Sequence, residues 1–395
     1  MVKMMMGRLA IAAAIALVAA SACASAEKSY SFERDGTSSV SYTGQTARLN
    51  MADELYDGMK SNESTVDMLL QQFNNGTGFA DPALDESGKN IAGKVASGCA
   101  REKNAAAKEK LEDNIKDFAN NVIPAWNTPA ADGTPGVLSD SKRTVNVNAK
   151  GWEMVQIFQK SLIGAFTLDQ IVNNYIEPCK LDDDGRKEEN DAGTMMKDKG
   201  FTRMEHAWDE AFGYLYGQEE DDTADLSTPS GVGTTLNKYL KKVSSGDVAP
   251  GISEEVFDAF VAGRKAIVDK DYEARDAAAK TIKIDLSKVI GAMVVNYLQE
   301  WIENKDENPA DAVHALSEGY GFIFSLPYTN DGEGKPYFTQ DEVDAILTKM
   351  DNFWTLQESD AQAVIDQVNE RFGFSAAKEK EEVKAEEEAP SSDDG

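Results

Sequence analysis

The two histidines of the chain occupy the same place in two similar segments. His206 stands four residues before Glu210, and His314 stands four residues before Glu318. Residues at this spacing lie on one face of an α-helix, where an imidazole nitrogen and a carboxylate oxygen can converge on one ion. If the two segments met, they would supply a mixed nitrogen and oxygen ligand set suited to Zn, Fe or Mn. With Asp209 added, these five residues are candidate metal ligands.

The same segments have a structural interpretation. A histidine and a glutamate on a buried helix face can hydrogen-bond across a core, which satisfies polar groups that are costly to leave unpaired. Gly213 and Gly321 fit close helix packing equally well. The aromatic side chains within the motifs, Trp208, Tyr214 and Tyr320, are candidate ligand-binding residues or core residues.

Several catalytic signatures are missing from the sequence. It has no H-E-x-x-H motif, no P-loop, no G-x-G-x-x-G after a strand and no G-x-S-x-G elbow. A chain with two histidines cannot build a three-histidine metal site. We therefore assign no catalytic residue and favour a binding protein over an enzyme.

An internal repeat indicates how these residues are positioned. Residues 206–215 align without gaps to residues 314–323, and similar apolar helical segments precede both. Each half therefore contains a long apolar helix, a loop and a second helix that carries the motif. The sequence predicts an all-α fold, a duplicated helical bundle whose halves, 27–250 and 251–375, are related by a pseudo-twofold axis.

Hydrophobic periodicity gives the boundaries of the expected elements. Helices are predicted over residues 103–122, 152–177, 254–268, 271–302, 309–324 and 339–371. Glycine, proline and acidic residues predict loops over 125–150, 181–193 and 217–251, and an irregular or strand-like segment over 28–45.

The N-terminus has the order of a secretory signal peptide. Lys3 and Arg8 are followed by an apolar run over 9–20 and then by small residues. This run is shorter than the roughly 20 residues that a spanning helix needs. Cleavage after Ala26 would release a periplasmic protein, whereas a lipoprotein signal ending before Cys23 would leave a lipid anchor on the outer membrane. Both alternatives predict export.

Charge and cysteine content limit the partners. The net charge of -29 predicts repulsion from nucleic acid. Cys99 and Cys179 could pair in an oxidising compartment or remain buried and unpaired. Residues 376–395, mostly Lys, Glu, Ala, Pro and Ser, lack apolar side chains to bury and predict a disordered acidic tail.

The segment 201–215 resembles the hallmark M-E-H-x-W-D-E-A-[FY]-G-Y of a family of exported bacterial domains of unknown function. Residues 30–34, 264–276 and 314–326 also resemble segments of this family. This family is distantly similar to the imelysin-like (iron-regulated, insulin-cleaving-peptidase-like) proteins, which are duplicated helical bundles with a G-x-H-x-x-E motif. Here Asp209 and Ser317 stand where that motif has its glutamate.

The resemblance implies a periplasmic or outer-membrane-associated binding protein in iron or other metal acquisition. It implies a divalent metal, Fe or Zn, as cofactor or cargo, and a metal ion or an outer-membrane protein as partner. Two alternatives belong to other classes. One is a metal-dependent hydrolase, an imelysin-like peptidase with Glu210 as base, and the other is a structural or interaction module with no small ligand.

Overall fold

The structure is a computed structural model that describes residues 29–102, 104–219 and 228–374. The predicted signal peptide and the predicted acidic tail both lie outside the described residues. Among the described residues, no helix has the length and the apolar character needed to cross a membrane.

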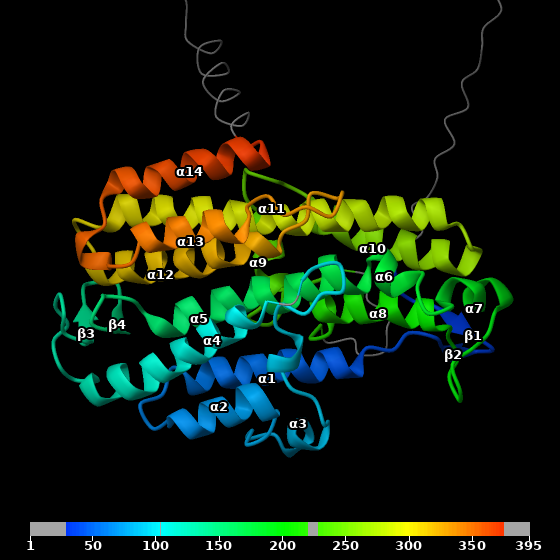
Figure 1. Cartoon of the computed structure of the whole chain (residues 1–395), viewed down its shortest axis with the longest axis horizontal. Helices are drawn as coiled ribbons and strands as arrows, with labels where there is room; N and C mark the ends of the chain where they lie inside the picture. Colours follow the sequence, from blue (N-terminus) through cyan, green and yellow to red (C-terminus); the bar gives the residue numbers. More distant parts are fainter. Residues whose placement is uncertain (1–28, 103, 220–227, 375–395) are drawn as a thin grey trace, which may run out of the picture.

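The described chain is mostly helical, which confirms the predicted all-α class (Figure 1). Its α-helices are α1 (Thr43–Gly58), α2 (Val66–Asn75), α3 (Pro82–Glu86), α4 (Ala105–Asp117), α5 (Met154–Leu162), α6 (Pro178–Leu181), α7 (Arg186–Ala192), α8 (Arg203–Tyr216), α9 (Leu236–Ser244), α10 (Ile252–Asp269), α11 (Tyr272–Asn304), α12 (Pro309–Ser325), α13 (Gln340–Lys349) and α14 (Glu358–Phe372). Two antiparallel hairpins accompany them, β1 (Glu33–Arg34) with β2 (Thr37–Ser38) and β3 (Gly136–Ser139) with β4 (Thr144–Val147).

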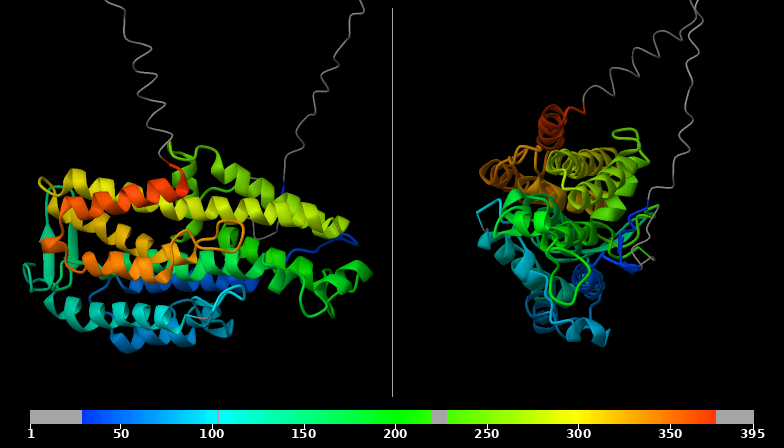
Figure 2. Two further views of the ribbon diagram at one scale, coloured as in Figure 1. Left: turned by 45° about the horizontal axis from the view of Figure 1, so that its top comes forward. Right: turned by 90° about the vertical axis from the view of Figure 1, so that its right-hand side faces the viewer.

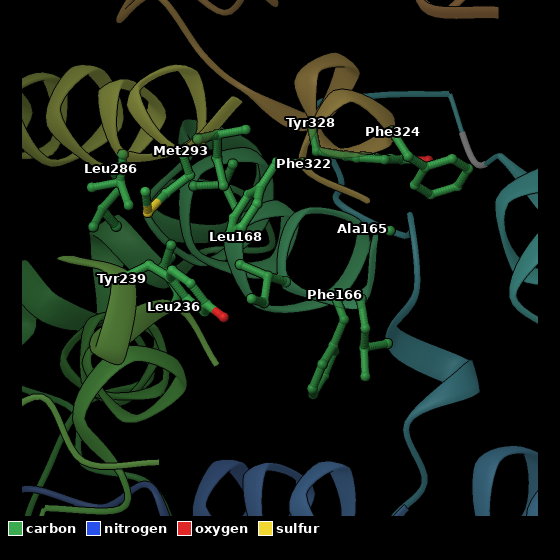
Figure 3. Close-up of a cluster of buried hydrophobic side chains, with 14 of the residues drawn as sticks. Ala165, Phe166, Leu168, Leu236, Tyr239, Leu286, Met293, Phe322, Phe324 and Tyr328 are labelled. Atoms are coloured by element: carbon green, nitrogen blue, oxygen red, sulfur yellow. The ribbon is translucent and has the colours of Figure 1, made fainter. Parts of the chain in front are cut away.

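The long helices run along the long axis of the molecule (Figures 1 and 2). The longest, α11, packs against α10, α12 and α14, and α12 packs in turn on α5. Apolar side chains from α1 through α14 form one continuous core. Its centre contains Phe166 and Leu168 after α5, Tyr239 of α9, Met293 of α11 and Phe322 of α12 (Figure 3). Both predicted halves therefore contribute to one core, while their pseudo-twofold relation remains a prediction.

Several segments differ from the sequence-based expectation. The predicted helix over 339–371 is two helices, because Asn352 accepts a hydrogen bond from the backbone of Trp354 and caps a short turn between α13 and α14. The predicted loops over 181–193 and 217–251 contain α7 and α9. The loop over 125–150 contains the β3–β4 hairpin, whose Val145 and Val147 are buried.

The helix predicted over 152–177 begins as α5 and continues as two π-helical segments, Ile163–Leu168 and Ile171–Tyr175. Such insertions into a helix are rare and often occur at functional sites. The second one ends at Tyr175, a wall residue of the pocket described below.

Candidate functional site

Helix α8 carries the first His-x-x-x-Glu motif. It begins with a capping box in which the Thr202 side chain accepts from the backbone of Glu205 and the Glu205 side chain accepts from the backbone of Thr202. Near the other end, Gly213 allows α1 to come close, since a Cβ atom there would lie 2.3 Å from Tyr42 Cβ. These features fix the direction of α8 and its distance from the segment that leads into α1.

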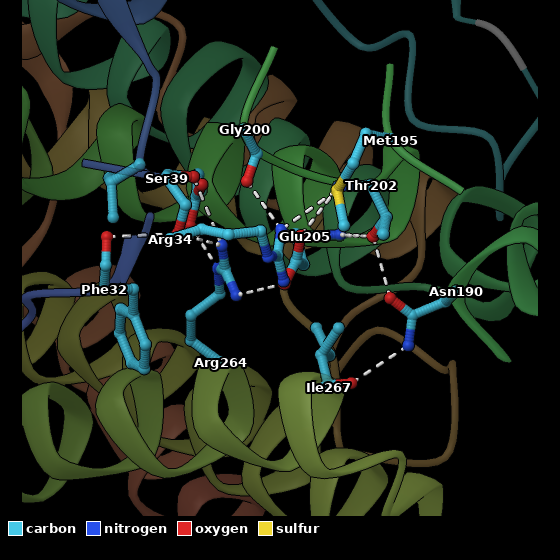
Figure 4. A network of polar contacts seen from close by, with 12 residues as sticks. Phe32, Arg34, Ser39, Asn190, Met195, Gly200, Thr202, Glu205, Arg264 and Ile267 are labelled. Carbon is cyan, nitrogen blue, oxygen red and sulfur yellow. Dashed lines mark hydrogen bonds and ion pairs between the residues drawn. The ribbon is translucent and has the colours of Figure 1, made fainter. Parts of the chain in front are cut away.

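The acidic residues on the inner face of α8 belong to a buried ion-pair network (Figure 4). Arg264 of α10 donates to Glu205 at 3.2 Å and to Asp209 at 2.8 Å, and both carboxylates are essentially inaccessible. Arg34 binds Glu205 from outside, and the Tyr30 hydroxyl donates to Asp209 at 2.7 Å. Burial raises the pKa of Asp209, an effect that Arg264 partly offsets. This network attaches the N-terminal segment to α8 and α10.

The outer face of α8 borders a pocket of about 380 Å³, called here the His206 pocket. His206 and Glu210 lie on its wall together with residues from the start of α1, from the segment 89–94, from the end of a π-helical segment and from the loop before α8. Its lining residues are Ser41, Tyr42, Thr43, Gly44, Gln45, Arg48, Lys89, Lys94, Tyr175, Met196, Lys199, Phe201, His206 and Glu210. The pocket therefore joins segments that are far apart in the sequence.

Cationic side chains dominate this lining. Arg48, Lys89, Lys94 and Lys199 all border the pocket, where Glu210 is the one carboxylate. Within the described part of the chain, none of the four cations forms a salt bridge with a carboxylate. The Arg48 guanidinium instead donates to two backbone carbonyl oxygens, at 3.0 and 3.1 Å, which fixes its orientation.

Two hydrogen bonds lie on the pocket wall. Lys94 Nζ donates to the Tyr175 hydroxyl at 3.1 Å, and Gln45 Nε2 donates to Glu210 Oε1 at 2.9 Å. Burial and the charge of nearby Arg48 lower the pKa of Lys94 to about 8. Burial and Glu210 raise the pKa of Tyr175, so its hydroxyl remains a hydrogen-bond donor.

His206 has a polar atom without a partner. Its ring stacks on Phe201, with centroids 4.9 Å apart, and its Nδ1 atom is buried without a hydrogen bond in the described structure. Buried polar atoms usually have partners, so this nitrogen leaves hydrogen-bonding capacity unused beside the pocket.

The second motif lies in a different environment. His314 of α12 approaches Glu153 through Nδ1 at 2.7 Å and Glu318 through Nε2 at 3.7 Å. Glu318 also pairs with the buried Lys160 of α5 at 2.9 Å. These contacts connect α12 to α5 and match the structural interpretation of the motif.

The structure does not bring the five candidate metal ligands together. His206 and Glu210 line the pocket, Asp209 is buried beside Arg264, and His314 and Glu318 contact α5. Across the described ranges, no group of three or more His, Cys, Asp or Glu side chains is placed to hold a metal ion. The metal-binding interpretation therefore gains no geometric support.

The three candidate ligand-binding aromatics also separate. Trp208 is fully buried and its indole donates to the Phe260 carbonyl oxygen at 3.0 Å, while Tyr214 is buried against Phe166. Both are core residues because the inner face of α8 carries them. Tyr320 is half-buried and lies in a different hollow, next to α4.

Sequence reasoning missed Arg48, Lys89, Lys94 and Lys199. No motif surrounds them, and each resembles an ordinary surface cation in its local sequence. The only sequence signal for such a site is the composition. With 69 acidic residues for 40 lysines and arginines, cations without an acidic partner should be uncommon. The composition does not identify which lysines and arginines lie close together.

The fold and the site define a class of protein, a helical single-core protein with a cationic pocket beside a His-x-x-x-Glu helix. The family model described as Domain of unknown function (DUF4856) matches residues 27–375, and the chain belongs to this family. The expectation of a domain family of unknown function is thus confirmed. No curated protein and no solved structure matches the chain.

Proposed function

We propose that the protein is an exported binding protein that holds a small anionic ligand in the His206 pocket. The observation that carries this proposal is the convergence of four cations that form no salt bridge in the described structure, in a chain whose net charge is -29. Like charges held close together repel each other, and the repulsion is stronger where water is partly excluded. An anion bound among them would relieve it.

The neighbouring groups suit such a ligand. Arg48 is oriented by backbone carbonyls and presents planar donors that match a carboxylate or a phosphate. Lys94 and the Tyr175 hydroxyl add polar groups at the same wall. Glu210 can accept a hydrogen bond from a hydroxyl or amino group of the same ligand. The volume of about 380 Å³ lies within the usual range for small-molecule sites.

Export is the second part of the proposal. The signal-like N-terminus supports it, and so does the disulfide between Cys99 and Cys179, because disulfides persist mainly in oxidising compartments. Attachment to the outer membrane through Cys23 and docking to a membrane protein remain predictions. The imelysin-like relationship, metal acquisition and the hydrolase alternative remain predictions as well.

We also infer that the two halves arose by duplication. Because Gly213 has no side chain, Gln45 packs directly against the surface of its helix. Lys160 packs against the helix surface at Gly321 in the same way. In both places this side chain hydrogen-bonds or ion-pairs with the glutamate three residues before the glycine. This shared arrangement supports a common origin, with one copy bordering a pocket and the other buried.

The test is titration calorimetry with phosphate, sulfate, succinate and citrate, with glucose as an uncharged probe and putrescine, which has no carboxylate, as a cationic probe. The pocket variant is Lys89→Gln/Lys199→Gln, whose side chains make no hydrogen bond or ion pair in the described structure. The matched control is Lys335→Gln/Lys349→Gln, which removes the same charge from exposed positions elsewhere.

We expect at least one anion to bind. Each contact between the bound anion and one of the two substituted lysines is a partly exposed charge pair worth about 0.5–1 kcal/mol. The pocket variant should therefore bind about tenfold more weakly, while the affinity of the control variant is unchanged. If no anion binds, or if both variants weaken binding equally, the proposal is wrong. Elemental analysis of untagged protein beside a His206→Ala/His314→Ala variant tests metal acquisition separately.

A further inference from the structure

A second hollow surface lies next to α12. Two hollows, of about 440 and 350 Å³, share Asn114, Tyr320 and Asp351 and so form one continuous groove. None of these three residues lines the His206 pocket. We call this surface the Tyr320 groove.

Three elements build the groove. Helix α4 and the residues after it form one wall, and α13 with Asp351 forms the other. Tyr320 and Phe324 of α12 lie between them. Trp152 supports the Tyr320 ring from the core side, with centroids 5.0 Å apart. The aromatic ring is therefore held in a fixed position.

Three of the four carboxylates that line the groove are paired with lysines, whereas the cations of the His206 pocket form no salt bridge in the described structure. Lys150 Nζ binds Asp351 at 2.6 Å, and Lys110 Nζ binds Asp344 at 2.7 Å. The amide of Asn148 donates to Asp117 at 2.7 Å. The four carboxylates would repel an anion, and both lysines of the lining already have partners, so the groove favours an uncharged ligand over an anionic one.

Two polar groups at the junction of the hollows have unused hydrogen-bonding capacity. The Asn114 side chain and the Tyr320 hydroxyl make no hydrogen bond within the described ranges. Burial and nearby carboxylates raise the pKa of Tyr320 to about 12, so its hydroxyl is a donor at neutral pH. Asn114 offers both a donor and an acceptor.

We propose that the Tyr320 groove binds a neutral oligosaccharide. A sugar ring presents a face of C–H groups, which an aromatic ring can contact, and an edge of hydroxyl groups, which amide and carboxylate groups can bind. The groove supplies a supported aromatic ring, an amide and a phenol at its centre, and carboxylates that already have ion-pair or hydrogen-bond partners. Its two joined hollows accommodate more than one sugar unit.

The experiment uses the full mature chain and the oligosaccharides derived from starch, cellulose, xylan and mannan. Binding is followed by calorimetry and by tryptophan fluorescence, since Trp152 contacts the Tyr320 ring. The test variants are Asn114→Ala, which removes no internal hydrogen bond, and Tyr320→Phe, which keeps the ring. The matched control is Asn120→Ala, an exposed asparagine outside the groove.

We expect one of these oligosaccharides to bind, the two groove variants to weaken binding about tenfold each, and the control to bind as the wild type does. Absence of binding to every neutral oligosaccharide would overturn the inference. So would unchanged affinity in both groove variants, or selective binding of an acidic polysaccharide such as polygalacturonate. Failure here leaves anion binding in the His206 pocket untouched, because the two sites share no residue.

Discussion

Replacing Glu318 with glutamine should destabilise the protein by removing one charge from a buried pair. The Glu318 carboxylate lies 2.9 Å from Lys160 Nζ, and both side chains are nearly inaccessible. Burial by itself would raise the pKa of Glu318, but the charges of Lys160 and His314 outweigh it and lower the pKa to about 2. In the variant, Lys160 keeps a hydrogen bond to Gln156 and loses its counter-charge.

The magnitude follows from the pKa difference between the folded and unfolded states. A fall from 4.5 to about 2 corresponds to about 3 kcal/mol of stabilisation. Loss of one partner of a buried ion pair commonly costs about 3–5 kcal/mol, which agrees. The pKa of Glu318 is lower in the folded state than in the unfolded state. The stabilisation is therefore complete above the pKa of the unfolded state and is lost as the pH falls through the pKa of the folded state. At pH 3, about 1 kcal/mol of this stabilisation should remain.

The assay is urea unfolding of the wild type and Glu318→Gln at pH 7 and pH 3. The difference in unfolding free energy should shrink from about 3 to about 1 kcal/mol, because the wild type itself becomes protonated. Glu342→Gln is the control. The pKa of Glu342 is also lowered to about 2, mainly by Arg371, but both side chains are substantially exposed, so the effect should stay below about 1 kcal/mol and weaken with salt.

A difference that is equally large at both pH values would refute this reasoning, since the loss would then come from packing and not from charge. A difference below about 1 kcal/mol at pH 7 would refute it as well, by showing that the Lys160 pair is no stronger than a surface pair.

Three further predictions concern the pocket, the disulfide and helix packing. Because burial lowers the pKa of Lys94 to about 8, its positive charge is lost as the pH rises through that value. Calorimetry should therefore show weaker anion binding at pH 9 than at pH 7. The Lys94→Gln variant should bind anions equally at both pH values. Cys99→Ser/Cys179→Ser removes a cross-link between residues 80 apart and should lower the urea-unfolding free energy by about 3–4 kcal/mol, with no added effect of reductant. Gly321→Ala would place a Cβ atom 2.5 Å from a lysine Cβ and should lower the melting temperature through about 1–3 kcal/mol of overpacking, whereas Gly319→Ala, with its nearest neighbour at 3.4 Å, should not.

The long helices could be predicted because their sequence pattern is local. The segments expected at 254–268, 271–302 and 309–324 are α10, α11 and α12, with ends that differ by a few residues at most. The short helix α7 was not predicted, since its acidic sequence resembles a loop. Its stability comes from the buried Asn190 side chain, which donates to the carbonyl oxygen of Ile267 on α10.

The candidate site was predictable only in part. The repeat singled out His206 and Glu210, which do border a pocket, but it paired them with His314, which contacts Glu153. Nothing in the local sequence of Lys94 indicates that it approaches Tyr175 across the chain. The pairing of Cys99 with Cys179 was left open and is resolved by the structure.

The sequence by itself determined the helical class, the main helices and the two positions where a histidine and a glutamate share a helix face. These features depend on spacings of three and four residues along the chain. The geometry of an α-helix places residues at such spacings on one face, whatever the tertiary structure. Tertiary structure decided which faces became core and which became pocket wall. That choice depends on the packing of every helix against every other, so the convergence of Arg48 and Lys94 beside Glu210 appears only once the chain is folded.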